Sequence, residues 1–427
     1  MEYIGYLCGG FSLAANRDES ARKLPGQWKE DIFSPEECRQ YELYYLPDFV
    51  RFSLCPDAGE DLSMRRYSME VEAAVTLPAE LARSSSDITV RIPRLRFYIC
   101  PFRTAMFSIQ MEMESGCEND ITAAVALLRN LSRLQSAGLE EFRDKALAPV
   151  TEVWRLLSAA AAEGAKEEYI RLVEDGNKFN VFQIARTDNA HWQEGGMDKL
   201  LFEMATVAPV GSYDSKSLDS PSKAYFKKIL EENSLSVYNN WKCLSLSDTL
   251  TILCSDCPQW LVNNWKDDYF GLIYIWQLFR RSYLFRLTRR FRYERENVGK
   301  LERESVDFER NCSFHRISYN FLPEEFCTCT SRGLKIEKEK AELYHMIAQE
   351  ESNSEKKADN RMNSLLFFMT CLTMASTIYD ACCLLQELLP YETTIGSSVT
   401  GFRLVASIML TIVLAALLVY RSKVKKS

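Results

Sequence analysis

The sequence predicts an α+β domain, a mixed sheet flanked by helices, followed by a long helix and a C-terminal two-helix membrane hairpin. Strand-like patterns recur before residue 255, a helical pattern free of Gly and Pro follows residue 334, and two apolar runs lie near the end of the 427-residue chain. These observations divide the chain into a cytoplasmic α/β domain (1–255), a helical stalk region (256–361) and a hairpin with a basic tail (362–427).

The segment up to about Ser115 is rich in strand patterns. Polar and apolar residues alternate from Tyr67 to Glu72, and a long run of strand-favouring residues extends from Ile88 to Glu114, interrupted at Pro93 and Pro101. Alternation with a period of two places successive side chains on opposite faces of a strand, so these runs favour a sheet.

Helical and mixed patterns follow. From Asp120 to Asp175, apolar residues such as Ala124, Leu127 and Leu131 recur at spacings of three and four, which predicts helix. The next region, to Cys254, has a mixed pattern. It predicts strands at Phe179–Ile184, Ser236–Leu244 and Thr249–Leu253, a helix at Lys199–Thr206 and a polar loop at Gly211–Lys223.

An aromatic-rich segment, Trp260 to Arg310, predicts a long helix outside the membrane. It contains Arg280, Arg281, Arg286, Arg289 and Arg290. Each would cost about 2.5 to 3.5 kcal/mol at the centre of a bilayer. We expect a core helix with a solvated basic side; the alternative is a lining for an anionic ligand or a partner subunit. Pro323 then interrupts the chain before a final helix that begins near Leu334.

The two apolar runs, Leu365–Leu385 and Leu404–Tyr420, predict membrane-spanning helices. A helix rises about 1.5 Å per residue, so each run can cross a hydrocarbon core of roughly 30 Å, with slight thinning for the shorter one. Basic residues precede the first run and follow the second, whereas the loop from Gln386 to Gly401 has none. Both ends are therefore expected to be cytoplasmic. A buried helical pair in a soluble domain would explain neither the lengths nor the basic flanks.

The N-terminus lacks the basic and apolar stretches of a signal peptide, so we expect the N-terminal domain to remain in the cytoplasm. The 14 cysteines would then lie mostly in a reducing compartment and act as small apolar residues, not as a disulfide framework. Two short-spaced pairs, Cys254 with Cys257 and Cys327 with Cys329, are too far apart and too unlike each other to form a zinc ribbon.

Composition also argues against several classes of function. His191, His315 and His345 lack the H-x3-5-H and HExxH spacings of catalytic zinc. The net charge of −7 argues against a protein that coats nucleic acid, although it allows a small nucleotide to bind. No Ser/His/Asp set, pair of catalytic acids or thiolate beside a histidine stands out, so we expect neither an enzyme nor a bound metal.

A polar stripe runs along the first predicted span. Asn363, Thr370 and Thr377 lie seven residues apart, and Thr373 and Asp380 form a second pair with this spacing, so all five share one helical face. A polar face in a bilayer must meet water or another helix. In an assembly of several copies this face would line a pore. Alternatively, the threonines bond their own backbone and small residues permit close helix packing.

The carboxylate of Asp380 is the most informative group in this stripe. A charge near the end of a span is costly unless it serves an aqueous pathway or meets a partner. In a ring of subunits Asp380 would attract cations, and Glu387 and Glu392 in the following loop would extend that field at the outer mouth.

This order of features, a cytoplasmic mixed domain, a long helix and two C-terminal spans with a short acidic loop, resembles the CorA divalent-cation channel family. That family closes its first span with Tyr-Gly-Met-Asn, where this chain has Tyr379-Asp380-Ala381-Cys382. The tyrosine matches, but the asparagine that holds hydrated magnesium is absent, so ordinary magnesium uptake is not expected. The segments Tyr238–Asp248 and Trp265–Arg281 look more like divergent bacterial relatives, which include membrane effectors of type III CRISPR systems.

The resemblance implies a homo-oligomeric, multi-pass channel of the bacterial inner membrane, a pentamer that conducts Mg²⁺ or another cation. It also implies opening by a nucleotide second messenger, a conjugate of S-adenosylmethionine and AMP. The alternatives are a constitutive divalent metal-ion transporter and a non-conducting, membrane-anchored interaction protein.

A nucleotide site would have to be built from scattered residues, because neither GxxxxGK[ST] nor GxGxxG occurs in a suitable place. Arginines would hold phosphate and aspartates would bind ribose hydroxyls. Each candidate has an alternative role as a solvated surface residue. The candidates are Arg94, Arg96, Arg103, Arg280, Arg281, Asp214 and Asp219.

Overall fold

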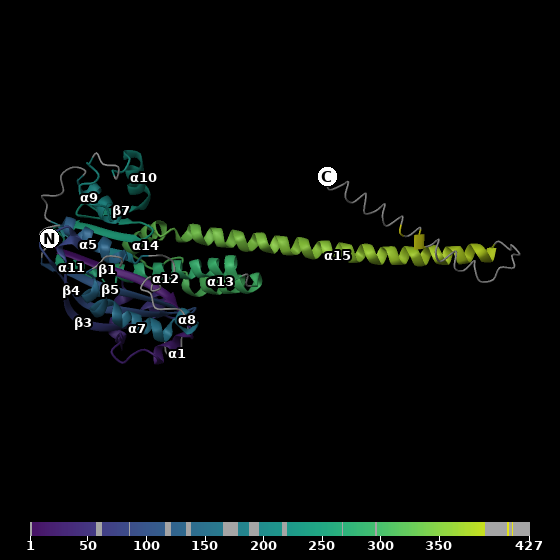
Figure 1. The fold of residues 1–427 in the computed structure, drawn as a ribbon, viewed down its shortest axis with the longest axis horizontal. Coiled ribbons are helices and arrows are strands. Elements are labelled where there is room, and N and C mark those ends of the chain that lie inside the picture. The colour runs from purple at the N-terminus through teal and green to yellow at the C-terminus, as the bar shows by residue number, and fades with distance from the viewer. Residues whose placement is uncertain are drawn as a thin grey trace. The chain divides into compact units, whose positions relative to one another are not determined.

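The computed structural model describes residues 2–56, 62–84, 86–115, 121–133, 138–164, 178–187, 196–215, 220–266, 268–294, 297–388, 408–409 and 412. Its contacts divide the chain into two units, Met1–Tyr344 and His345–Ser427. The described part of the first unit contains a nine-stranded mixed sheet with helices packed on it (Figure 1). The predicted domain type is therefore confirmed.

The sheet has the strand order β2-β3-β4-β5-β1-β6-β9-β8-β7. Neighbouring strands are antiparallel except β6 and β9, which run parallel. The strands are β1 Glu2–Ser12, β2 Lys29–Glu30, β3 Arg65–Leu77, β4 Ile88–Cys100, β5 Thr104–Ser115, β6 Asn180–Thr187, β7 Ser234–Tyr238, β8 Trp241–Ser245 and β9 Thr249–Ser255.

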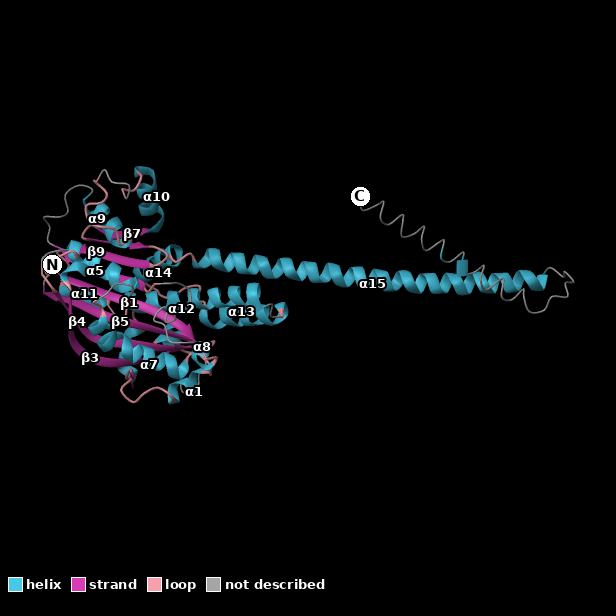
Figure 2. Cartoon of the chain, in the orientation of Figure 1, coloured by secondary structure: helices cyan, strands magenta, loops and turns pink. Residues whose placement is uncertain are grey.

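Helices surround this sheet (Figure 2). The α-helices of the described residues are α1 Arg17–Arg22, α2 Pro35–Tyr41, α3 Pro47–Ser53, α4 Ala79–Ala82, α5 Ile121–Arg133, α6 Glu140–Phe142, α7 Ala148–Leu157, α8 Ala159–Ala162, α9 Gly196–Ala205, α10 Lys223–Asn233, α11 Gln259–Trp265, α12 Phe270–Arg289, α13 Val298–Cys312, α14 Phe321–Gly333 and α15 Ile336–Leu388. Two π-helical turns lie at Arg143–Leu147 and Arg290–Glu294.

Apolar side chains point to both faces of the sheet along the central strand β1, which explains why helices cover both faces. Leu7 belongs to the same apolar core as Leu128 of α5. On the opposite face, Tyr6 stacks on Phe182 with ring centroids 5.2 Å apart, and Phe182 in turn lies 5.7 Å from Tyr274 of α12. Successive side chains of a strand point to opposite faces, so each face packs against its own helices.

The predicted strand-rich run over 88–114 forms the hairpin β4–β5. The interruption predicted at Pro101 is confirmed, because Phe102 and Arg103 have φ of +55° and +54° in the turn between the strands. The interruption predicted at Pro93 is wrong: β4 continues through it, and the pairing with β5 shifts register between Arg91 and Leu95. Such an irregularity accommodates a residue without an N–H.

The predicted strand at 236–244 is two strands. β7 ends at Tyr238 and β8 begins at Trp241, and these two residues pair across the turn at Asn239 and Asn240. Asparagine tolerates turn conformations, so the Asn-Asn pair is the sequence feature that indicates this turn. The strands predicted at 179–184 and 249–253 are confirmed as β6 and β9, and the helix at 199–206 as α9.

The single long helix predicted from Trp260 to Arg310 is wrong, because this segment forms the separate helices α11, α12 and α13. Within it, α12 is a core helix, as expected, and most of its residues are buried. Its arginines were expected to form a solvated basic side. That expectation is wrong for Arg280. Arg280 is 5% exposed and pairs with Glu337 of α15 at 3.2 Å. Arg286 donates a 2.9 Å hydrogen bond to Ser12 Oγ at the end of β1. These arginines therefore tie α12 to neighbouring elements.

The last helices carry the chain from the sheet to the C-terminal segment. Pro323 was expected to interrupt the chain, but it lies in the first turn of α14, where a missing N–H costs nothing. The break falls instead at Leu334 and Lys335, and Lys335 has a φ of +58°. α15 then runs without interruption from Ile336 to Leu388, which confirms the predicted continuous helix.

Gly333, the last residue of α14, lies directly against β8. A Cβ here would overlap the hydroxyl and carbonyl oxygens of Ser245. We expect Gly333→Ala to lower the free energy of unfolding by about 1 to 3 kcal/mol, because backbone must move to relieve the overlap. Urea unfolding followed by tryptophan fluorescence measures the change. Gly26→Ala is the matched control, since its Cβ would have no atom within 4 Å. Equal unfolding midpoints for the two variants would contradict the contact.

Candidate functional site

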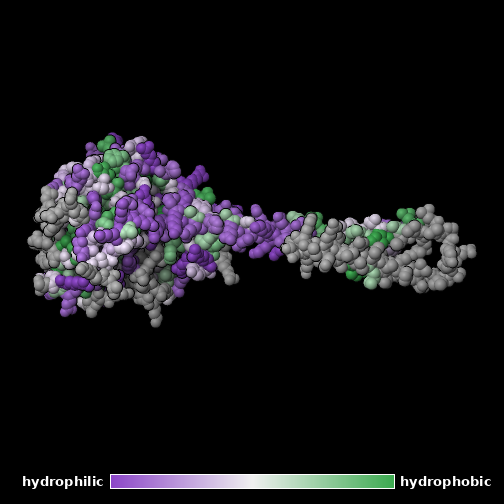
Figure 3. Space-filling view, turned by 90° about the horizontal axis from the view of Figure 1, so that it is seen from above, coloured by the Kyte–Doolittle hydropathy of each residue, from purple (hydrophilic) through white to green (hydrophobic). Residues whose placement is uncertain are grey.

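The apolar part of α15 is the first candidate. Among the described residues, Ile336–Ala381 is the one helix long and apolar enough to cross a membrane by length and composition, and its most apolar window is 0% buried. Leu365 and Phe368 are 64% and 62% exposed. Figure 3 shows hydrophilic side chains along the earlier part of this helix and hydrophobic ones farther on. An apolar surface of this kind fits a bilayer or a partner helix.

The predicted polar stripe is on the surface of α15. Asn363, Thr370, Thr373, Thr377 and Asp380 are all exposed. At 3.6 residues per turn they lie within an arc of about 100°. The threonine hydroxyls donate to backbone carbonyls one turn earlier, at 2.7 Å from Thr370, 2.9 Å from Thr373 and 2.7 Å from Thr377. The threonines therefore bond their own backbone, which is the alternative that the sequence also allowed. This arrangement leaves the lone pairs of the hydroxyl oxygens on the exposed face.

Asp380 and Asn363 differ from the threonines. Neither side chain has a hydrogen bond or ion pair to any other residue that the structure describes. A carboxylate and an amide on an apolar helix require water or a neighbouring helix as hydrogen-bonding partners.

Several predicted residues lie outside what the structure describes. Glu387 is in the last turn of α15, where only the backbone is described. Glu392 and Asp219 lie outside the described residues, as does the second predicted span apart from residues 408, 409 and 412.

The three candidate arginines near β4 have different surroundings. Arg94 pairs with Glu70 at 2.7 Å on the surface. Arg96 is 5% exposed and lies 3.9 Å from Asp268. Arg103 is in the β4–β5 turn. They do not converge on one point.

The other described candidates are also engaged separately. Arg280 pairs with Glu337, and Arg281 of the same helix donates to the carbonyl oxygen of Ser247 in the β8–β9 turn. Asp214 accepts from Lys199 Nζ at 2.8 Å. The structure thus distributes the candidate ligand residues over several ion pairs and hydrogen bonds.

A partly buried ionic cluster links the N-terminal segment to the start of α12. Arg66 pairs with Asp268 and also, at 2.7 Å, with Asp31. Tyr41 of α2 donates to Asp268 at 3.0 Å. Burial opposes ionisation of Asp268, but the guanidinium groups of Arg66 and Arg96 and these hydrogen bonds hold its pKa below the ordinary value. Asp268 is therefore a carboxylate that fixes α2 and β3 in place.

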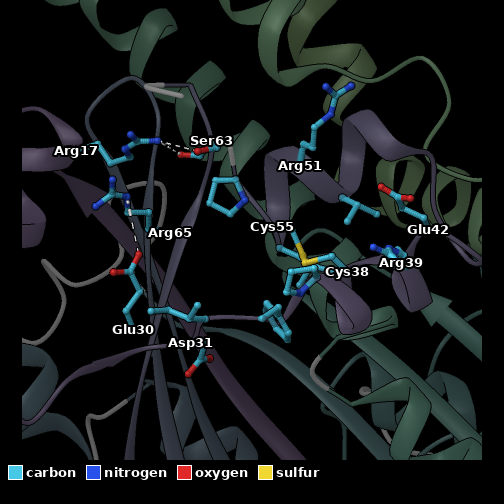
Figure 4. A pocket seen from close by; sticks show the side chains of 16 residues that line it. Arg17, Glu30, Asp31, Cys38, Arg39, Glu42, Arg51, Cys55, Ser63 and Arg65 are labelled. Atoms are coloured by element: carbon cyan, nitrogen blue, oxygen red, sulfur yellow. Dashed lines mark hydrogen bonds and ion pairs between the residues drawn. A yellow bond between two sulfur atoms is a disulfide. The ribbon is translucent and has the colours of Figure 1, made fainter. Parts of the chain in front are cut away.

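A cavity of about 530 Å³ opens beside this cluster, between α2, α3 and the start of β3 (Figure 4). Its charged lining residues are Arg17, Arg39, Arg51, Arg65, Glu30, Asp31 and Glu42. Figure 4 shows Arg17 and Arg65 near one another and Arg39 close to the disulfide. None of these arginines was a candidate from the sequence. The available signal was the capping box at Ser34 and Glu37, which begins α2 and predicts a helix there.

The disulfide is between Cys38 of α2 and Cys55 after α3, and it lines the same cavity. The expectation that cysteines serve only as small apolar residues is wrong for this pair. It is confirmed for free cysteines such as Cys8 and Cys243, which are buried. Burial raises the pKa of both thiols well above the ordinary value, which disfavours the thiolate form.

Reduction of the Cys38–Cys55 bond is expected to lower the free energy of unfolding by about 3 kcal/mol, the chain-entropy value for a loop near this length. The bonded residues are 17 apart in sequence. Urea unfolding with and without a thiol reductant measures the effect. The double variant Cys38→Ser/Cys55→Ser is the control and should not respond to reductant. A reductant effect of equal size in that variant would contradict the assignment.

No group of three or more His, Cys, Asp or Glu side chains within the described ranges is arranged to hold a metal ion. Comparisons of the chain with protein-family models, curated proteins and solved structures give no match.

Proposed function

We propose that this chain is a cation channel of the bacterial plasma membrane, CorA-like in design, that a nucleotide second messenger opens. In this proposal copies of the chain form a ring, five by the family resemblance, with both termini in the cytoplasm. The messenger is a conjugate of S-adenosylmethionine and AMP, and the biological setting is type III CRISPR antiviral defence.

One observation carries this proposal: α15 exposes a long apolar surface that includes a narrow polar stripe ending at Asp380. A helix that served only as an anchor would have no use for a carboxylate at this depth. In a ring, the stripes would face one another around a water-filled axis, and the apolar remainder would face lipid. The Asp380 carboxylates would then attract cations and repel anions.

Ion pairs connect the first two turns of α15 to α12 and α13, and they offer a route for gating. Glu337 pairs with Arg280 of α12 at 3.2 Å, and Lys340 pairs with Glu309 of α13 at 2.6 Å. Because α15 is one uninterrupted helix, a shift of α12 or α13 would be transmitted along its axis. A messenger opens the channel only if it binds the open state more tightly than the closed state.

Two alternatives use the same hairpin. A constitutive divalent metal-ion transporter would conduct without a messenger, and a membrane-anchored interaction protein would not conduct at all. The substitution of Asp380, Ala381 and Cys382 for the family's Gly-Met-Asn favours the channel over the magnesium transporter, because the asparagine carbonyls that hold the hydrated ion are missing.

The test is cation flux from liposomes that contain the purified full chain, with and without the conjugate. The proposal predicts flux only with the conjugate. Flux of equal size without it would support the transporter. Absence of flux in both conditions, with insertion shown by flotation, would support the anchored interaction protein.

A further inference from the structure

We propose that the Cys38–Cys55 disulfide is a thiol-exchange site, at which a small thiol such as glutathione reduces the bond and thereby releases α2 from the fold. The partner is a low-molecular-weight thiol, and the product is the dithiol form of the chain. Both steps take place in the unit Met1–Tyr344 and need no ion flux, so they are independent of the proposed channel activity.

The two bonded cysteines are within reach of a small thiol. Cys38 and Cys55 are half-buried and line the cavity of about 530 Å³, and Figure 4 shows their bond among the lining side chains. This volume is within the range of small-molecule sites. Most of the free cysteines in the described ranges, such as Cys8 and Cys243, are buried. Accessible disulfides are the labile ones, whereas structural disulfides resist reduction by glutathione.

The reaction is thiol–disulfide exchange in two steps. The thiolate of a small thiol attacks one sulfur of the bond, forms a mixed disulfide there and expels the other cysteine as a thiolate. A second small thiolate attacks the outer sulfur of the mixed disulfide, so the two small thiols leave as their own disulfide and the second cysteine is freed. The protein disulfide gains two electrons and two protons, and the two small thiols lose them.

The helix α2 depends on this bond because it buries little surface. None of its residues, Pro35–Tyr41, is buried, whereas α3 buries most of its residues, including Phe49 and Phe52. Cys38 and Arg39 line the cavity, so this side of α2 faces a hollow and not a packed core. A helix this short is not stable alone in water. α3 is therefore anchored by its own side chains, and the disulfide tethers α2 to it.

Polar and aromatic side-chain contacts from α2 to other described parts of the chain are few. The Tyr41 hydroxyl donates to Asp268 at 3.0 Å, and the Tyr41 ring meets the ring of Phe33 with centroids 5.3 Å apart. The capping box of Ser34 and Glu37 joins the helix only to its own first turn. Reduction therefore favours release, because the opened segment regains the conformational freedom that the closed loop denied it.

Release of α2 affects the starts of two other helices. Asp268, just before α12, loses the hydrogen bond from Tyr41. The residues that follow α2 are bonded to the segment before α14, where the Asn320 side chain donates to the Leu43 carbonyl oxygen at 3.1 Å. The redox state of the bond is thus transmitted to α12 and α14.

The first test is the redox state of the bond in the full chain purified in detergent. The chain is equilibrated with reduced and oxidised glutathione at a series of ratios, quenched with acid, alkylated and analysed by mass spectrometry. We expect Cys38 and Cys55 to be mostly reduced at the ratio of a reducing cytosol and bonded at the ratio of an oxidising compartment. The buried thiols of Cys8 and Cys243 are the internal control and should take up no glutathione. A bond that stays oxidised at every ratio, or one that never forms, would overturn the site.

Amide hydrogen exchange of the same samples tests the release of α2. We expect exchange in α2 to become about a hundredfold faster on reduction, which is the factor implied by the chain-entropy effect of a loop near this length. The matched control is α10, which also buries no residue but contains no cysteine, and its exchange should not change. The variant Cys38→Ser/Cys55→Ser should exchange rapidly in α2 with or without glutathione. Equal exchange of α2 in the oxidised and reduced chain, or an equal rise in α10, would contradict the release.

Discussion

Replacing Asp380 by asparagine is expected to lower messenger-dependent cation flux about tenfold, the lower end of what a charge-lined constriction contributes. Asparagine keeps the size and hydrogen-bonding groups of the side chain and removes its charge. A ring of such substitutions would abolish the field that concentrates cations at this end of the pore. Flux from liposomes in saturating conjugate measures the effect, and reversal potentials across a salt gradient report the accompanying loss of cation selectivity.

Asp359→Asn is the control for this experiment. Asp359 is another exposed carboxylate of α15, but it precedes the apolar stretch. Its substitution should change flux little, because in the proposed orientation this charge lies outside the membrane and is screened by salt. Unchanged flux in Asp380→Asn, or equal loss in both variants, would contradict a role for Asp380 in the ion pathway.

Trp276→Ala is expected to lower the free energy of unfolding by about 3 to 5 kcal/mol. Trp276 is fully buried, and its Nε1 donates a 3.0 Å hydrogen bond to the Cys312 carbonyl oxygen. Its ring centroid lies 5.3 Å from that of Phe49 and 5.9 Å from that of Phe314. Alanine would leave a cavity among these rings and an unpaired carbonyl group. Urea unfolding measures the loss; Trp260→Ala, at a side chain 63% exposed, should cost little. Equal losses would contradict this core.

The elements that periodicity predicted well are those with local signals. β4 and β5 alternate and flank a turn at Pro101 to Arg103, and α15 has a long helical pattern with no Gly or Pro. The alternation pattern does not separate β7 from β8, because a two-residue turn barely disturbs it. The interruption expected at Pro93 does not occur, because β4 passes through this residue with a shift of register. That shift depends on the pairing with β5 and not on β4 alone.

The candidate site was less predictable because its contacts join distant parts of the sequence. Arg66 and Asp268 are 202 residues apart, and Arg286 bonds Ser12 across 274 residues. Residue type alone cannot distinguish an arginine in an ion pair from one that lines a cavity. Arg94 and Arg65 illustrate this, since both lie on strands beside a glutamate and one of them faces the cavity.

The central claim is that the exposed apolar surface of α15 lies in a bilayer. Membranes from cells that express the full chain, washed with alkaline carbonate, test it most directly, with a chain ending at residue 361 as the comparison. We predict that the full chain stays in the membrane pellet and the shorter chain is released. Recovery of the full chain in the supernatant as a soluble oligomer would contradict the claim, because the apolar helices would then be covered by one another.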